Sequence, residues 1–152
     1  MEQGARFQCF IDEDNQVIVI RAIGDIPPAT FVDLVFEKLS AIPEPWTFGR
    51  LFDVRRWEHR LGAETVRALA ERWVELTEGK IYHARIAVVT HDHGTQFRTA
   101  VASEHFPDET VCYFDDYHEA SGWLRSTDPA GFLKKLAGKP PNQQSYGGIV
   151  IE

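Results

Sequence analysis

A chain of 152 residues is about the size of one domain, and at that length a single core can bury roughly 70% of the surface that the unfolded chain exposes. The composition is 43% hydrophobic and 26% charged, which excludes disorder over most of the chain. The formal net charge of −7 argues against nucleic acid and anionic membranes as partners, because both are bound through clustered lysine and arginine.

The first part of the chain predicts a β-hairpin followed by a helix. The runs RFQCFI and VIVIRAI are rich in β-branched and aromatic residues, and the polar turn DEDNQ joins them. GDIPP suits a helix entry, since proline is tolerated in the first turn. Apolar residues then recur at helical spacing: Phe31, Val32, Val35, Phe36 and Leu39. We expect this helix to end before Pro43.

The middle of the chain predicts two further strands with a helix between them. RLFDVR is predicted to be the third strand, and an apolar stripe from about Gly62 to Glu78 predicts a helix that Gly79 ends. ARIAVVT has no polar side, which favours a central strand covered on both faces. A short helix from about Gly94 to Glu104 is predicted to follow it.

The last part predicts a fifth strand, TVCYF, and helices over YHEASGWLRS and DPAGFLKKLAG. Asp116, with Glu119 three residues later, forms a capping box for the first of these helices. The order of elements predicts an α/β fold, in which an N-terminal hairpin and alternating helices and strands form a mixed five-stranded sheet. We expect one domain over residues 1–136 and a C-terminal tail over 137–152.

The tail and the charge pattern predict self-association. The segment GKPPNQQSYGG has linker composition, and we expect the apolar residues 149–151 after it to dock on this chain or on a neighbouring copy, for example as an added edge strand. Acidic residues gather between Arg98 and Arg125, whereas arginines gather from Arg50 to Arg72. These stretches are either ordinary solvated faces or surfaces that are complementary between copies. With the apolar end of the tail, they lead us to expect a homo-oligomer, most simply a dimer.

Several core patterns carry a family resemblance. The order and residue pattern of four segments resemble those of the SpoIIAA-like group of bacterial STAS/SEC14-type domains. The segments are VIVIRAIGDIPPATFVDLV, LFDV leading into a helix, RIAVVT and VCYFDDYHEASGWL. The chain resembles this group from about Val17 to Leu124. The resemblance implies the fold, and a fold by itself does not determine a function.

The resemblance also implies a class of activity. The anti-sigma-factor antagonists to which this group is similar are non-enzymatic switches, phosphorylated on a serine where the helix after the third strand begins. The corresponding segment here, WEHRLGAETVR, has Thr65 as its only hydroxyl and lacks the flanking pattern. A non-enzymatic domain without that phosphorylatable serine is therefore expected. The SEC14-like side of the resemblance implies lipid or acyl-chain binding, for which a chain of this length has little spare volume.

Histidines at the strand ends raise the question of a metal site. His91 and His93 have the HxH spacing that can place two imidazoles on one metal, and Asp116 or His118 could add a third ligand at the same sheet edge. The segment THDHG equally suits a helix cap. We favour the cap and expect neither a metal nor another cofactor. The alternative is an enzyme or metal-binding protein that uses His91, His93 and His118.

An anion site is the other candidate. Loops that follow parallel strands gather at one edge of a sheet, so three segments should be neighbours: 55–61, 90–94 and 115–118. Arg55, Arg56 and His59 would bring hydrogen-bond donors to the start of the second helix. Alternatively, the arginines only form surface ion pairs with Glu58, Asp115 and Asp116, worth about 0 to 1 kcal/mol each. The weak ligand-binding candidates are Arg55, Arg56, His59, His91, His93, Asp116 and His118.

The cysteines, Trp57 and the lengths of the apolar runs indicate the cellular setting and the burial that we expect. Cys9 and Cys112 lie in predicted strands without CxxC spacing, which indicates reduced thiols. Trp57 lies among charged residues, where half-burial is more common than exposure for recognition. No signal-peptide segment and no membrane span are predicted, because apolar runs stay below roughly 18 residues. We expect a cytoplasmic, non-enzymatic domain that acts in protein interaction or in sensing of a small anionic ligand.

Overall fold

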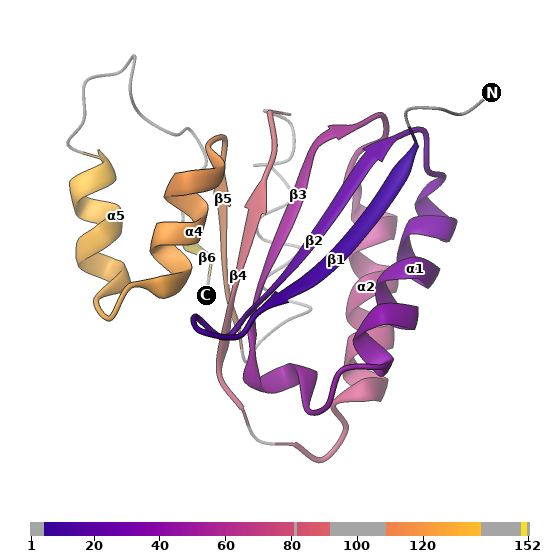
Figure 1. Ribbon diagram of the computed structural model, residues 1–152, viewed down its shortest axis with the longest axis horizontal. Coiled ribbons are helices and arrows are strands. Elements are labelled where there is room, and N and C mark those ends of the chain that lie inside the picture. Colours follow the sequence, from indigo (N-terminus) through magenta and orange to yellow (C-terminus); the bar gives the residue numbers. More distant parts are fainter. Residues whose placement is uncertain (1–4, 81, 92–108, 138–149, 152) are drawn as a thin grey trace.

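The computed structural model describes residues 5–80, 82–91, 109–137 and 150–151, and over these residues the chain folds as a sheet with helices on both faces (Figure 1). The sheet is mixed and six-stranded, and its strand order follows the chain from β1 to β6. The predicted α/β class is thereby confirmed. The predicted helix near residues 94–104 lies outside the described residues.

All five predicted strands are present, and a sixth is added. The strands are β1 (Arg6–Asp12), β2 (Val17–Gly24), β3 (Gly49–Trp57), β4 (Ala84–Val89), β5 (Glu109–Phe114) and β6 (Val150–Ile151). The first two form the predicted antiparallel hairpin, and β2 to β5 run parallel to one another. The short β6 pairs antiparallel with β5, so the end of the chain lies along the edge of its own sheet.

Helices cover the two faces of the sheet unequally. The helices are α1 (Pro28–Ser40), α2 (Ala63–Leu76), α4 (Tyr117–Arg125) and α5 (Pro129–Ala137), with a short 3-10 turn, η1 (Pro45–Thr47). Figure 1 shows α1 and α2 on one face, and α4 and α5 on the other. α4 packs mainly on β3, β4 and β5 and covers Val17 and Val19 of β2. Among the described residues, it leaves the same face of β1 without a helix.

The helix ends follow from local chemistry. Proline occupies the first turn of α1, where no backbone N–H partner is needed. Gly79 follows α2 with a positive φ of 79°, a conformation that costs glycine little. The Asp116 carboxylate accepts a hydrogen bond from the Glu119 backbone N–H at 3.0 Å, which confirms the predicted cap of α4. None of the described helices is long and apolar enough to cross a membrane.

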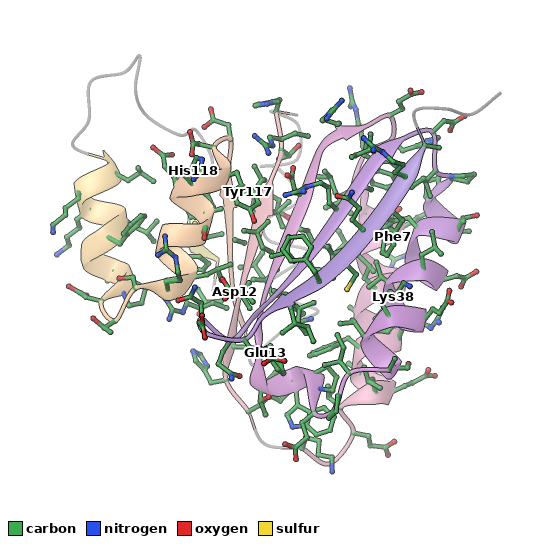
Figure 2. The ribbon with its side chains drawn as sticks, viewed as in Figure 1. Phe7, Asp12, Glu13, Lys38, Tyr117 and His118 are labelled. Atoms are coloured by element: carbon green, nitrogen blue, oxygen red, sulfur yellow. The ribbon has the colours of Figure 1, made fainter. Side chains whose placement is uncertain are left out.

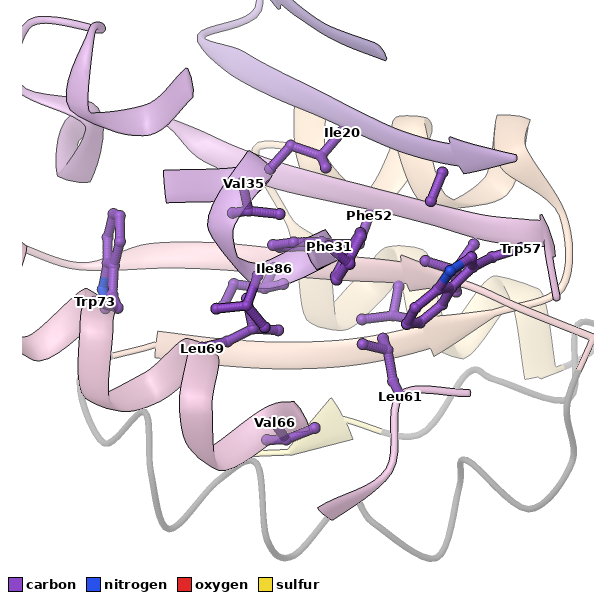
Figure 3. Packing of buried hydrophobic residues seen from close by; sticks show 14 of the residues in the cluster. Ile20, Phe31, Val35, Phe52, Trp57, Leu61, Val66, Leu69, Trp73 and Ile86 are labelled. Carbon is purple, nitrogen blue, oxygen red and sulfur yellow. The ribbon is translucent and has the colours of Figure 1, made fainter. Parts of the chain in front are cut away.

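The larger part of the core lies between the sheet and α1 and α2 (Figure 3). The Trp57 ring stacks on Phe31, with ring centres 4.6 Å apart, and its indole N–H donates to the Ile26 carbonyl at 2.7 Å. Trp57 is only 6% exposed, so the expected half-burial is wrong. Charged neighbours in the sequence do not reveal this burial, because the partners of Trp57 come from the distant segment 26–31.

A second cluster lies under α4, where Trp123 and Leu124 pack on the opposite face of the sheet. β4 contributes to both clusters: Ile86 and Val88 belong to the first, and Ala87 and Val89 to the second. This explains the absence of a polar side in ARIAVVT and confirms the predicted central strand.

The hydrogen bond from Trp57 supports a first prediction. Trp57→Phe should lower the free energy of unfolding by about 1 to 3 kcal/mol, because the buried Ile26 carbonyl loses its indole donor. Urea denaturation followed by circular dichroism measures this change. Val74→Ala is the control, since Val74 is 56% exposed and its truncation should change stability by less than about 0.5 kcal/mol. Equal stability of Trp57→Phe and the unmutated protein would contradict the prediction.

Candidate functional site

A buried carboxylate organises the sheet face that α4 leaves open. Asp53 of β3 is 3% exposed and lies opposite Arg21 of β2 in the parallel register. Arg21 Nε donates to Asp53 Oδ2 at 3.1 Å. Arg55 binds the same carboxylate with two nitrogens, Nε to Oδ1 at 2.9 Å and Nη2 to Oδ2 at 2.8 Å. Two guanidinium groups thus share one carboxylate.

The charges of this cluster stabilise one another. Burial by itself would raise the pKa of Asp53, but the hydrogen bonds and the charge of Arg55, together with the hydrogen bond from Arg21, hold that pKa below its ordinary value. The hydrogen bond to Asp53 in turn raises the pKa of Arg55 despite partial burial. The Asp53 carboxylate and the Arg55 guanidinium group are therefore both charged at neutral pH.

Aromatic rings flank the outer faces of both arginines. The Arg21 guanidinium carbon lies 5.4 Å from the centre of the Tyr117 ring and 5.9 Å from that of Phe10. The Arg55 guanidinium carbon lies 5.9 Å from the Tyr117 ring. Tyr117 belongs to the first turn of α4, with His118 beside it (Figure 2). These contacts are cation–π interactions, which restrict the arginine side chains further.

A hollow of about 270 Å³ opens over this cluster. Two apolar residues, Ala22 and Ile23, form part of its lining, and the polar residues that line it are Arg6, Gln8, Arg21, Asp53, Arg55 and Arg56. The lining therefore contains four arginines and one carboxylate, in a chain whose net charge is −7. We name this feature the arginine hollow. Its excess of positive charge suits an anion.

Only part of the predicted anion site lies in the arginine hollow. Arg55 and Arg56 line it, and Arg56 is exposed. His59 instead bonds Asp25, with Nε2 2.7 Å from Oδ1. Arg55 does form an ion pair, but with the buried Asp53 rather than with a surface carboxylate of the loops. Asp53 is therefore the main partner of Arg55, and the charge of Asp116 acts on Arg55 in addition.

The remaining candidates are spread along the same edge of the sheet. His91 is exposed just after β4, and His118 is exposed on α4. Asp116 serves as the cap of α4. His93 lies outside the described residues, so the HxH hypothesis stays a prediction. Within the part of the chain that the structure describes, no group of three or more histidine, cysteine, aspartate or glutamate side chains is arranged for a metal ion.

Sequence reasoning missed Arg6, Arg21 and Asp53. A signal for two of them was present, since Arg21 is the single charge in VIVIRAI and Asp53 the single acid in RLFDVR. A charge inside an apolar strand usually needs a partner on the neighbouring strand. The identity of that partner depends on the register between β2 and β3.

Two other hollows are weaker candidates. An apolar cavity of about 40 Å³ lies among α1, α2 and the sheet, with Arg50 over the Trp73 ring at 3.6 Å. Pockets for drug-sized ligands measure roughly 300 to 1,000 Å³, so this cavity is too small for an acyl chain. A groove of about 880 Å³ lies at the opposite end of the sheet. Its Arg85 donates to the carbonyls of Trp123 and Ser126, which makes that arginine a cap for α4.

The hydroxyl and thiol groups considered as reactive sites are shielded. Thr65 is buried near the start of α2. Cys112 is also buried, and burial raises the pKa of its thiol to about 12. Burial likewise raises the pKa of the half-buried Cys9 thiol. Neither cysteine is activated as a nucleophile, because the thiolate is the reactive form.

Comparisons with known proteins add a fold neighbour. No protein-family model matches this chain, and no curated protein matches it in sequence. Among solved structures, it is similar to an uncharacterized protein of the DUF3478 family from Shewanella loihica PV-4, described as having a SpoIIAA-like fold. The identity is 21% and the TM-score 0.49, over 80% of this chain and 94% of that chain. The fold named for that protein is the one that the sequence resembles.

The shared carboxylate supports a second prediction. Arg55→Ala should lower the free energy of unfolding by about 1 to 3 kcal/mol, because the buried Asp53 loses its bidentate guanidinium partner and keeps only Arg21 and the backbone N–H of residue 55. Arg56→Ala is the matched control, since it removes the same charge from the next, exposed residue and should change stability by less than about 0.5 kcal/mol. Thermal and urea unfolding of both variants measure the difference, and equal effects would refute it.

The lowered pKa of Asp53 supports a third prediction. In the unfolded chain an aspartate has a pKa of about 3.9, whereas in the native protein Asp53 stays ionised to lower pH. The stabilisation from Asp53 is therefore fully present above about pH 4 to 5 and is lost as the pH falls through the native pKa. Urea unfolding between pH 2.5 and 6 should show a shallower loss of stability at acidic pH in Asp53→Asn. An unchanged slope would contradict the assignment.

Proposed function

We propose that this chain is a non-enzymatic, cytoplasmic binding domain whose arginine hollow receives an anionic group, carried by a small ligand or by a protein partner. The proposal rests on one observation: four arginines and a single aspartate line a hollow of about 270 Å³. The lining has three more positive than negative charges, which favours an anion there, and in a chain of net charge −7 this concentration is not a general property of the surface.

The arginines are held in place before any ligand arrives. Asp53 holds Arg21 and Arg55, Gln8 Oε1 accepts from Arg21 Nη1 at 3.3 Å, and the Tyr117 ring lies against both guanidinium groups. The side chains of Arg21 and Arg55 are 27% and 30% exposed, so their outer edges still reach the hollow. Such preorganisation reduces the side-chain entropy that binding would otherwise cost.

The chemistry favours a carboxylate or a phosphate. A guanidinium group has five N–H donors in a planar fork, and Asp53 uses at most two donors of either arginine. The remaining donors match the paired oxygens of a carboxylate or phosphate group. The exposed Phe10 and the half-buried Tyr117 lie beside them, and aromatic residues next to arginine are typical of protein-binding surfaces.

Titration calorimetry tests the proposal. Inorganic phosphate, citrate and short peptides rich in aspartate and glutamate are the probes, and we expect at least one to bind at low salt. Arg56→Gln should weaken that binding about tenfold, because it removes one exposed charge from the hollow without touching Asp53. The control is Arg72→Gln, which removes an equal charge from α2, where Arg72 pairs with Asp33.

Two outcomes would overturn the proposal. One is that the unmutated protein binds none of the probes. The other is that Arg56→Gln and Arg72→Gln weaken binding equally, since net charge rather than the arginine hollow would then explain the attraction.

A further inference from the structure

Among the described residues, β1 forms an edge of the sheet, and its central residues, Phe7 to Ile11, include no charge and no proline. β1 is the first strand of the sheet and, among the described residues, pairs only with β2. An edge strand presents unpaired backbone N–H and C=O groups, which proteins usually shield with charges, proline or bulges. The seven residues of β1 are RFQCFID, so charge is present only at the two ends, Arg6 and Asp12.

The sequence of β1 is complementary to itself in the antiparallel direction. If two copies pair about a two-fold axis through Cys9, Arg6 lies opposite Asp12 of the other copy, and Phe7 lies opposite Ile11. Oppositely charged and apolar pairs across antiparallel strands stabilise the pairing. A shift of register by one residue would separate both pairs, so the complementarity selects a single register.

On the face of the arginine hollow, pairing of two copies would give the exposed Phe10 side chain an aromatic neighbour. Phe10 is 46% exposed, and together with Val74 it is one of two large exposed apolar residues among the described residues. In the paired arrangement it would lie diagonally across the axis from Phe10 of the other copy, within reach of an aromatic contact. Asp12 and Glu13 lie where β1 leads into the hairpin turn (Figure 2). In the paired arrangement this acidic turn would lie at the Arg6 end of the other copy.

On the opposite face of the sheet, half-buried apolar side chains line the same edge, and we call them the apolar fringe. Phe7, Cys9 and Ile11 of β1 and Leu34 of α1 are half-buried and pack on the main core. A second copy across the two-fold axis would cover this fringe with an identical one. Burial of apolar surface on both faces adds to the backbone hydrogen bonds of the new strand pair.

We propose that β1 pairs antiparallel with β1 of a second copy of this chain, centred on Cys9, so that the two sheets continue into one. The Arg6–Asp12 complementarity and the exposed Phe10 identify the second copy as the occupant of this edge. The pairing does not depend on anion binding by the arginine hollow.

Sedimentation of the full chain over a range of concentrations tests the pairing. We expect a dimer, and Phe10→Lys should raise its dissociation constant about tenfold or more, because two like charges would then meet across the axis close to Arg6. The matched control is Val74→Lys, which changes the other exposed apolar residue and should leave the dimer intact. A monomer at every concentration, or equal effects of the two variants, would overturn the proposal.

Disulfide trapping tests the register. Oxidation at mildly alkaline pH, which offsets the raised pKa of the Cys9 thiol, should link two copies through Cys9 in the unmutated protein and in Cys112→Ser, but not in Cys9→Ser. Phe10→Lys should yield much less of the linked dimer. A charge exchange gives an independent readout: Arg6→Asp alone should weaken the dimer, and adding Asp12→Arg should restore it. Restoration supports the Arg6–Asp12 pair. A dimer without the Cys9 link, or no recovery in a folded double variant, would refute this register.

Discussion

The structure depends on the burial of the Asp53 carboxylate in the middle of the sheet. An unpaired buried carboxylate costs several kcal/mol, so the chain must bring cations to it. Arg21 arrives from the neighbouring strand because β2 and β3 run in register at that position. The register shifts between Arg21 and Ile23, and Arg55 turns back onto Asp53 just beyond that point. The ion pairs therefore hold both the pairing of β2 with β3 and the local irregularity of β3.

The unequal cover of the two sheet faces explains where the candidate sites lie. α1 and α2 cover one face with a large apolar cluster, whereas α4 packs mainly on β3, β4 and β5 of the other face and, among the described residues, reaches β2 only at Val17 and Val19 and through Tyr117. On that face β1 carries polar side chains and the exposed Phe10 instead of a buried apolar row. The arginine hollow and the β1 edge are both consequences of the same missing cover.

Local patterns in the sequence predicted most of the fold, because strand and helix periodicity, proline entry and the Asp116 cap are all properties of neighbouring residues. The candidate site was predicted only in part. Asp53 and Arg21 are 32 positions apart, and the pairing of His59 with Asp25 spans 34. Such pairs depend on strand register and loop placement, which periodicity does not specify. Trp57 was misjudged for the same reason, since Phe31 lies far from it in the sequence.

Anion binding in the arginine hollow and pairing of β1 with a second copy would both use the guanidinium group of Arg6. Each process is therefore expected to weaken the other. Arg6 lines the arginine hollow and also ends β1, where the Asp12 carboxylate of a second copy would face it. An anion in the hollow and that carboxylate would compete for the same guanidinium group. By thermodynamic linkage, a ligand that weakens the strand pairing must itself bind more weakly to the paired form. A domain with both proposed properties would therefore report the binding of an anion as a change in its own association.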